Sequence, residues 1–115
     1  NFSPDGREIV TASFDNTAKI WDAQTGELLH TLVGHTSFVV SANFSPDGRR
    51  IVTASFDNTA KIWDAQTGDL IHTLNGHTSS VISANFSPDG REIVTGSRIT
   101  AGSFDGKVNL YKSLY

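Results

Sequence analysis

The chain has 115 residues, of which 37% are hydrophobic and 18% are charged, a composition typical of a folded protein and too apolar for a disordered one. Its net charge is −3 and its lysines and arginines are scattered singly, which argues against nucleic-acid binding as the main role. No apolar run is long enough to cross a membrane. Cysteine is absent, which excludes disulfides and cysteine-ligated zinc and fits the reducing cytoplasm, where we expect the protein to act.

The sequence consists of near-identical repeats. Residues 43–84 repeat residues 1–42 at a constant offset of 42, with six differences: Glu8/Arg50, Glu27/Asp69, Leu29/Ile71, Val33/Asn75, Phe38/Ser80 and Val40/Ile82. A third copy starts at Asn85 and follows the first without change to Val94. Repetition with a period of about 40–45 residues indicates a propeller or a solenoid. We therefore treat residues 1–115 as a single domain of three units, 1–42, 43–84 and 85–115.

Each unit predicts four short strands separated by turns. In the second unit, a first strand ends at a Ser-Pro-Asp-Gly turn, in which proline presets φ and glycine accepts a positive φ. β-Branched residues dominate the runs and helical spacing of apolar residues is absent, so we expect an all-β fold. The turns fall at residues 45–48, 57–58 and 67–68, and the strands between and after them at residues 50–55, 60–63 and 69–74.

The third unit departs from the pattern. Residues 93–97 are followed by Arg98 and then by a similar stretch, residues 99–103, which inserts six residues relative to the first unit. Either stretch could serve as the second strand of the unit, so the strand register is poorly specified. We expect a bulge or an enlarged excursion around residues 98–103, more as a tolerated surface insertion than as a binding loop. The divergent C-terminus, residues 110–115, is typical of a cap.

Several markers recur in one order and at one spacing: the Gly-His pairs ending at His35 and His77, the Trp-Asp pairs starting at Trp21 and Trp63, and the repeated Phe-Ser-Pro-Asp-Gly. They resemble the WD-repeat β-propeller family. The resemblance implies four-stranded antiparallel blades around a central channel, with the first strand of each blade innermost. The chain holds about 2.7 units, fewer than the roughly 4–8 blades of a closed propeller. Either the chain is an excerpt of a longer protein, which we favour, or copies of it associate to complete a ring.

The resemblance also implies a structural tetrad of hydrogen-bonded side chains. In the second blade the tetrad is His35, Thr53, Asp57 and Trp63. An aspartate carboxylate can accept from the imidazole, the imidazole can reach a hydroxyl, and that hydroxyl can accept from the indole N–H. Partial tetrads are expected in the other units: Thr11, Asp15 and Trp21 in the first, and His77 and Asp105 in the third, where Ala101 falls at the hydroxyl position and Tyr111 replaces the tryptophan.

No motif indicates catalysis or metal binding. The histidines come in pairs, His30 with His35 and His72 with His77, but no third ligand is spaced with them. We expect His30 and His72 to face water from the outer strand. No nucleophile-elbow, paired-carboxylate or phosphate-loop pattern occurs, so we expect neither an enzyme nor a cofactor.

The phenylalanines give the one indication of a binding surface. Phe14, Phe56 and Phe104 each precede the turn aspartate, and Phe38 lies near the same rim. In the resembled family this rim belongs to the top face, which often holds partners, and exposed aromatic clusters are common binding hot spots. The interpretation is a non-catalytic scaffold that docks a protein or peptide partner. The alternative is a structural repeat whose blades associate with other blades, either upstream in a longer chain or from copies of itself.

Overall fold

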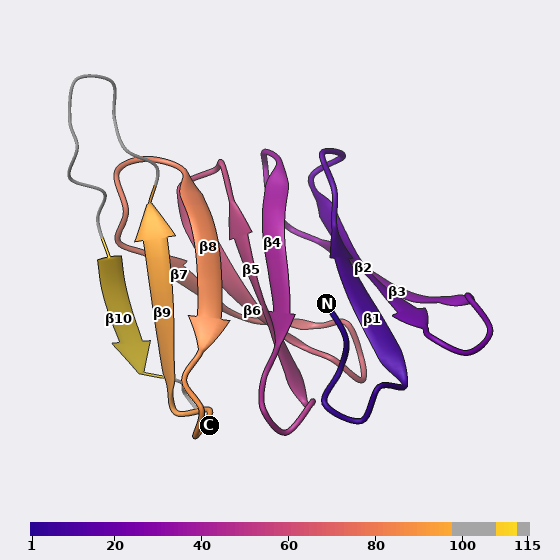
Figure 1. Cartoon of the computed structure of the whole chain (residues 1–115). Helices are drawn as coiled ribbons and strands as arrows, with labels where there is room; N and C mark the ends of the chain where they lie inside the picture. The colour runs from indigo at the N-terminus through magenta and orange to yellow at the C-terminus, as the bar shows by residue number, and fades with distance from the viewer. Residues whose placement is uncertain (98–107, 113–115) are drawn as a thin grey trace.

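A computed structural model of the chain describes residues 1–97 and 108–112; for Ser97 and residues 108–112 only the backbone is described. The described residues form ten β-strands and no helix, arranged as three antiparallel sheets. Figure 1 shows the sheets standing side by side, each turned slightly from the next, without closing into a ring. The prediction of an all-β propeller segment with an incomplete ring is therefore confirmed.

The middle sheet is the complete four-stranded blade. Its strands lie side by side in chain order, and they are β4 (Val39–Phe44), β5 (Arg50–Ser55), β6 (Thr59–Asp64) and β7 (Leu70–Asn75). The first sheet has three strands, β1 (Glu8–Ala12), β2 (Thr17–Asp22) and β3 (Leu28–Val33). The third contains β8 (Val81–Phe86), β9 (Glu92–Ser97) and β10 (Val108–Lys112). We call these sheets the first, second and third blades.

The turns form where the sequence supplies residues that tolerate a positive φ. In the Asp-Asn turn between β5 and β6, Asn58 has a φ of 74°, and its counterpart Asn16 has a φ of 73°. Asparagine adopts this left-handed conformation more readily than most residues. In the turn between β4 and β5, Ser45 Oγ donates to Asp47 at 2.6 Å, and the Asp47 carboxylate accepts from the N–H of Arg49 at 3.0 Å. These local bonds fix the strand register from one turn to the next.

The hydrophobic core lies between the blades. Because side chains of a strand alternate between its two faces, β5 is buried on both sides, with Ile51 in the cluster shared with the first blade and Val52 in the cluster shared with the third. Burial of a side chain of this size contributes about 1.5–3 kcal/mol. Between the first two blades the buried residues are Val10, Ala18, Ile20, Leu32, Val39, Ala42, Ile51, Trp63 and Ala65. Between the last two they are Val52, Ala54, Ala60, Ile62, Val81, Ala84 and Ile93.

The ambiguous strand of the third unit is settled by pairing. β9 (Glu92–Ser97) pairs with β8 through Phe86↔Ile93 and Ala84↔Thr95, and on its other side with β10. The earlier of the two similar stretches therefore serves as the second strand of the blade. The expected excursion around residues 98–103 lies outside the described residues.

Candidate functional site

Four polar side chains of the second blade form a continuous chain of hydrogen bonds. His35 precedes β4, Thr53 lies in β5, Asp57 in the following turn and Trp63 in β6. His35 Nδ1 is 2.7 Å from Asp57 Oδ2, and His35 Nε2 is 2.7 Å from Thr53 Oγ1. Trp63 Nε1 donates to the same Thr53 hydroxyl at 2.9 Å. The structure thus brings together the four side chains that the resemblance assigned to a tetrad.

Burial determines the charge states of His35 and Asp57 in this hydrogen-bond network. The side chain of His35 is inaccessible to solvent and that of Asp57 is 7% exposed. Burial lowers the pKa of His35, against the opposing effect of the Asp57 carboxylate. Although burial opposes it, hydrogen bonds from Thr59 and His35 hold the pKa of Asp57 below its ordinary value. A neutral imidazole that donates from Nδ1 to the carboxylate and accepts at Nε2 from the Thr53 hydroxyl satisfies every group.

The glycine before His35 is required by close packing. A Cβ atom at Gly34 would lie 3.0 Å from the Cη2 atom of the Trp63 indole. A side chain at this position would crowd the indole, so glycine suits the close approach of the backbone to Trp63.

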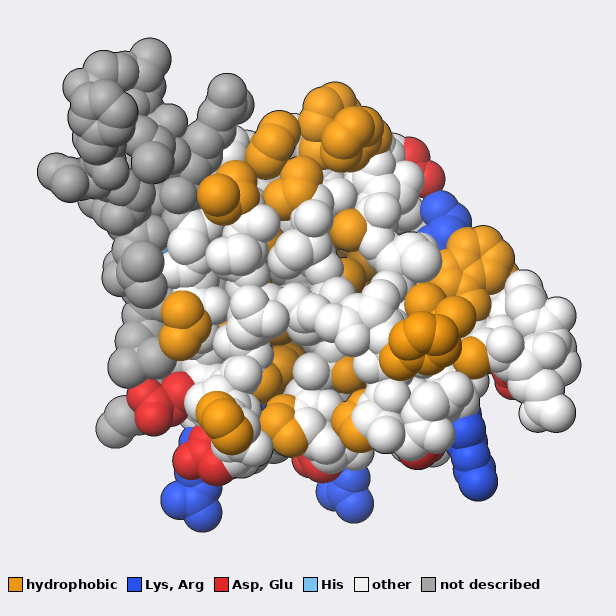
Figure 2. Space-filling model, in the orientation of Figure 1, with side chains coloured by type: hydrophobic (Ala, Val, Ile, Leu, Met, Phe, Trp, Pro, Cys, Tyr) orange, Lys and Arg blue, Asp and Glu red, His pale blue; other side chains and the backbone are white. Residues whose placement is uncertain are grey.

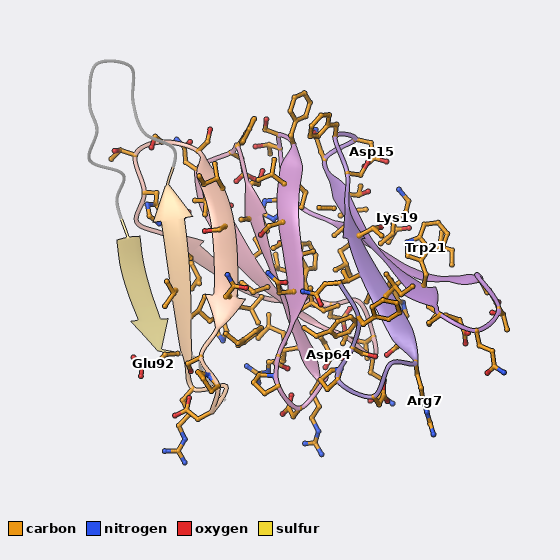
Figure 3. All side chains as sticks on the ribbon, viewed as in Figure 1. Arg7, Asp15, Lys19, Trp21, Asp64 and Glu92 are labelled. Carbon is orange, nitrogen blue, oxygen red and sulfur yellow. The ribbon has the colours of Figure 1, made fainter. Side chains whose placement is uncertain are left out.

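The described residues of the first blade include three of the four tetrad positions, Thr11, Asp15 and Trp21. Trp21 Nε1 donates to Thr11 Oγ1 at 3.0 Å, as in the second blade, but the described residues place no imidazole beside Thr11. Lys19 Nζ instead pairs with Asp15 Oδ2 at 3.0 Å. Hydrogen bonds from Thr17, Lys19 and Ser13 hold the pKa of Asp15 well below its usual range. Figure 3 shows Asp15, Lys19 and Trp21 following one another along one side of this blade.

In the second blade, which has a histidine beside the turn aspartate, the lysine and the aspartate have different partners. There the lysine that corresponds to Lys19 is Lys61, whose Nζ donates to Thr73 Oγ1 at 3.0 Å. The Oδ2 atom of Asp57 bonds instead to His35 and to the backbone N–H of Thr36, which donates at 3.1 Å, while Oδ1 accepts from Thr59. Lysine and histidine therefore take alternative positions at the turn aspartate.

The third blade corrects one sequence assignment. His77 Nε2 is 2.7 Å from Thr95 Oγ1, and both residues are buried. The assignment of Ala101 to the hydroxyl position was wrong, because β9 is formed by the earlier stretch and Thr95 supplies the hydroxyl. A sequence signal existed, since the third unit is identical to the first from Asn85 through Thr95, and Thr95 is the counterpart of Thr11. Asp105 lies outside the described residues, as does the side chain of Tyr111.

Three of the four predicted partner-binding phenylalanines lie next to one another. The ring of Phe38 stacks on Phe14 with centroids 4.7 Å apart and lies 6.0 Å from Phe56 in a tilted arrangement. Phe14 is 71% exposed, Phe38 is 41% exposed and Phe56 is partly buried. Figure 2 shows hydrophobic side chains gathered on the upper edge of the molecule, over the start of β4. We call Phe14, Phe38 and Phe56 the aromatic arc; Phe104 lies outside the described residues.

The outer histidines do not simply face water. His30 in β3 and His72 in β7 are both half-buried. A Cβ atom at Gly68 would lie 3.3 Å from His30 Nδ1, so this imidazole packs against the Thr-Gly turn of the next blade. Among the described residues, no group of three His, Cys, Asp or Glu side chains could hold a metal ion. The same residues include no helix that is long and apolar enough to span a membrane.

The blades, the Gly-His and Trp-Asp markers and the hydrogen-bonded side chains define a propeller-type repeat protein. The sequence matches the family described as WD domain, G-beta repeat over residues 1–22, 26–64 and 68–112. The chain belongs to the WD-repeat family. WD repeats generally mediate protein–protein interaction and scaffolding, and proteins built from them are generally non-catalytic scaffolds.

Similar curated proteins share single repeats with this chain. A dynein assembly factor with WD repeat domains 1 from Xenopus laevis is 47% identical over 38 residues, 33% of this chain and 9% of that protein. Ribosome assembly protein 4 from Saccharomyces cerevisiae is 60% identical over 30 residues, 26% of this chain and 6% of that protein. F-box/WD repeat-containing protein 7 from Drosophila melanogaster is 54% identical over 37 residues, 32% of this chain and 3% of that protein. The matched stretches cover less than a tenth of each relative.

Proposed function

We propose that this chain is a non-catalytic scaffold segment whose aromatic arc docks a protein or peptide partner. The observation that carries the proposal is the exposure of stacked aromatic rings at one edge of the sheets. Exposing a ring such as that of Phe14 to water is unfavourable, and covering it with a partner contributes favourably to the free energy of binding. Aromatic residues, phenylalanine among them, are enriched at the cores of protein–protein interfaces.

A difference between the repeats supports the same surface. Phe38 has Ser80 as its counterpart in the second unit, so the stacked pair of Phe14 and Phe38 exists only where the first two blades meet. A core function does not account for Phe38, since its ring remains 41% exposed. We infer that one partner side chain of apolar character anchors at this pair. Asp15 and Lys19 beside it supply charge for orientation.

Selection of peptides from a random phage-displayed library tests this proposal. We expect enriched peptides with apolar residues, whose binding weakens at least tenfold in the double variant Phe14→Ser, Phe38→Ser. The far-UV circular dichroism of the variant should match that of the wild type. An Arg7→Ala variant, altered on the opposite edge, should bind as the wild type does. Equal binding to wild type and double variant would refute the arc as the docking surface.

A second candidate function is self-assembly through the outer faces of the end blades. Val94 in the third blade is 41% exposed, whereas its counterparts Val10 and Val52 are buried against a neighbouring blade. Native mass spectrometry of the 115-residue chain distinguishes the two functions. A discrete trimer that is lost in a Val94→Asp variant supports assembly, whereas a monomer with an intact aromatic arc supports docking alone. We further infer that the protein acts in the cytoplasm, without nucleic-acid or membrane partners, from its net charge of −3 and its lack of cysteine.

A further inference from the structure

A single peptide link of the chain joins an asparagine to a glycine, Asn75–Gly76. It lies at one of the six positions where the first two units differ, since the first unit has Val33 in place of Asn75. Asn75 is the last residue of β7, and Gly76 opens the connection that Figure 1 shows running from β7 to β8. Both residues are exposed, so water reaches this link in the folded chain.

An asparagine that is followed by glycine can lose its side-chain amide without an enzyme. The backbone nitrogen of the glycine attacks the side-chain carbonyl carbon, ammonia leaves, and a cyclic imide forms. Water then opens the imide at either of its carbonyls, which gives aspartate or isoaspartate. Glycine favours the first step because no Cβ atom hinders its nitrogen and its backbone rotates freely. The reaction consumes water and releases ammonia, and nothing is oxidised or reduced.

The fold leaves both reacting groups of this link available. Among the described residues, neither the side-chain amide of Asn75 nor the N–H of Gly76 makes a hydrogen bond. Asn75 stands opposite Thr59 at the end of its ladder, and the Thr59 N–H donates to Asp57 Oδ1 at 3.0 Å. Strand ends open more readily than strand interiors. The peptide plane can therefore rotate toward the side chain without breaking the pairs farther along β7.

The other asparagines are less suited to the reaction. Each is followed by phenylalanine, threonine or leucine, whose side chains hinder the attacking nitrogen. Asn43 Nδ2 also donates to the carbonyl of Ala84 at 2.8 Å, which holds this amide between two blades. Asn58 precedes Thr59, whose N–H is already bonded to Asp57. The attacking nitrogen is thus hindered or engaged at these positions.

The Asp-Gly links of the Ser-Pro-Asp-Gly turns could form the same imide, but the turns restrain them. In the turn between β4 and β5, the Gly48 N–H donates to the carbonyl of Ser45 at 2.9 Å, so the attacking nitrogen is engaged. Although burial opposes it, hydrogen bonds from Ser45 and from the Arg49 N–H hold the pKa of Asp47 below its ordinary value. An ionised carboxylate resists attack by a nitrogen nucleophile.

We propose that the Asn75–Gly76 link deamidates spontaneously in the folded chain and that its isoaspartyl product displaces His77. Isoaspartate routes the main chain through the former side chain, which adds one atom between Leu74 and Gly76. Leu74 packs against the cluster shared by the second and third blades, and His77 is buried with its Nε2 atom 2.7 Å from Thr95 Oγ1. Since these two side chains fix the length of chain between them, the added atom moves His77 from Thr95 and loosens the contact between the blades.

Incubation of the 115-residue chain in mildly alkaline buffer, followed by peptide mapping with mass spectrometry, tests the site. The peptide that contains residue 75 should show conversion of the amide to an acid and should split into two chromatographic peaks, one for each product. Asn75→Val, which introduces the residue of the first unit, should abolish the change. Asn75→Gln should slow it at least about tenfold, because the larger ring forms less readily. Conversion that occurs in urea but not in the folded chain, or that is faster at Asn43 or Asn58, would overturn the assignment.

Urea unfolding and hydrogen exchange of the separated products test the structural consequence. The isoaspartyl form should have a lower urea midpoint than the unaged chain, and its β8 amides should exchange at least about tenfold faster. Asn75→Asp, which has the added charge but an unaltered main chain, should keep both values near those of the wild type. Asn75→Val incubated in the same buffer controls for other damage. Equal midpoints for the isoaspartyl form and the Asn75→Asp variant would refute the displacement of His77.

Discussion

The first and second blades have almost the same sequence and very different surroundings. Trp63 is 1% exposed and packs against the first blade, whereas its counterpart Trp21 is half-buried, and the described residues place no other blade against it. Thr53 is completely buried and meets two partners, whereas Thr11 is exposed and meets one. Identical residues therefore contribute differently to the free energy of unfolding, because the neighbouring blade buries one copy and leaves the other exposed. The four predictions below test this difference.

Trp63→Ala should destabilise the chain by about 3–5 kcal/mol, because it removes a large buried side chain and leaves a cavity. Trp21→Ala should cost less than about half of that amount, since water already reaches its ring. Urea unfolding followed by far-UV circular dichroism measures both. Equal losses for the two variants would show that the blades are energetically equivalent despite their different burial.

Thr53→Val should destabilise by about 1–3 kcal/mol for each buried group that it leaves without a partner, namely the Nε2 atom of His35 and the Nε1 atom of Trp63. Thr11→Val should stay within about 0.5 kcal/mol of wild type, because water can satisfy the exposed Trp21 N–H. The same unfolding measurement applies. A large effect of Thr11→Val would reveal a buried network in the first blade.

The stability of the second blade should depend on pH through His35. Burial lowers its pKa in the folded state, so the unfolded chain binds the proton first as the pH falls through about 6.5. The contribution of the neutral His35 to the free energy of unfolding is therefore fully present above that pH and is lost progressively below it. Asp57 and Lys61 are the charged groups that face the imidazole. The urea midpoint should drop between pH 7.5 and pH 5 in wild type, and His35→Gln should flatten this drop. An unchanged wild-type midpoint would contradict a buried neutral imidazole.

Glu8→Arg should stabilise the first blade by about 0.2–1 kcal/mol. Glu8 stands opposite Asp22 on the neighbouring strand, whereas its counterpart Arg50 stands opposite Asp64. Burial raises the pKa of Glu8, and the nearby carboxylates of Asp5 and Asp22 add to this effect. The urea midpoint should rise in Glu8→Arg and fall in the reverse variant Arg50→Glu. In the strand register of the third blade, Glu92 stands opposite Lys112.

The sequence predicted the repeated turns, the strand order and the family, because these depend on local residue types at a fixed spacing. The four tetrad positions of the second blade also followed from motifs, and the structure places those side chains within hydrogen-bond distance. The register of the third blade could not be predicted, since two similar stretches compete and only pairing with β8 and β10 selects the first. The pairing of Lys19 with Asp15 was also missed, because the counterpart Asp57 bonds to a histidine and its lysine, Lys61, bonds to Thr73 instead.

The amino-acid sequence by itself determined that each unit folds as an antiparallel sheet, since proline, glycine and asparagine fix the turns and β-branched residues favour the strands between them. Only the tertiary structure decided which copy of each residue is buried. Val52 lies in the core and Val94 is exposed although their strands are nearly identical. Burial of these residues requires a neighbouring blade, and the residue type alone does not determine whether one packs there.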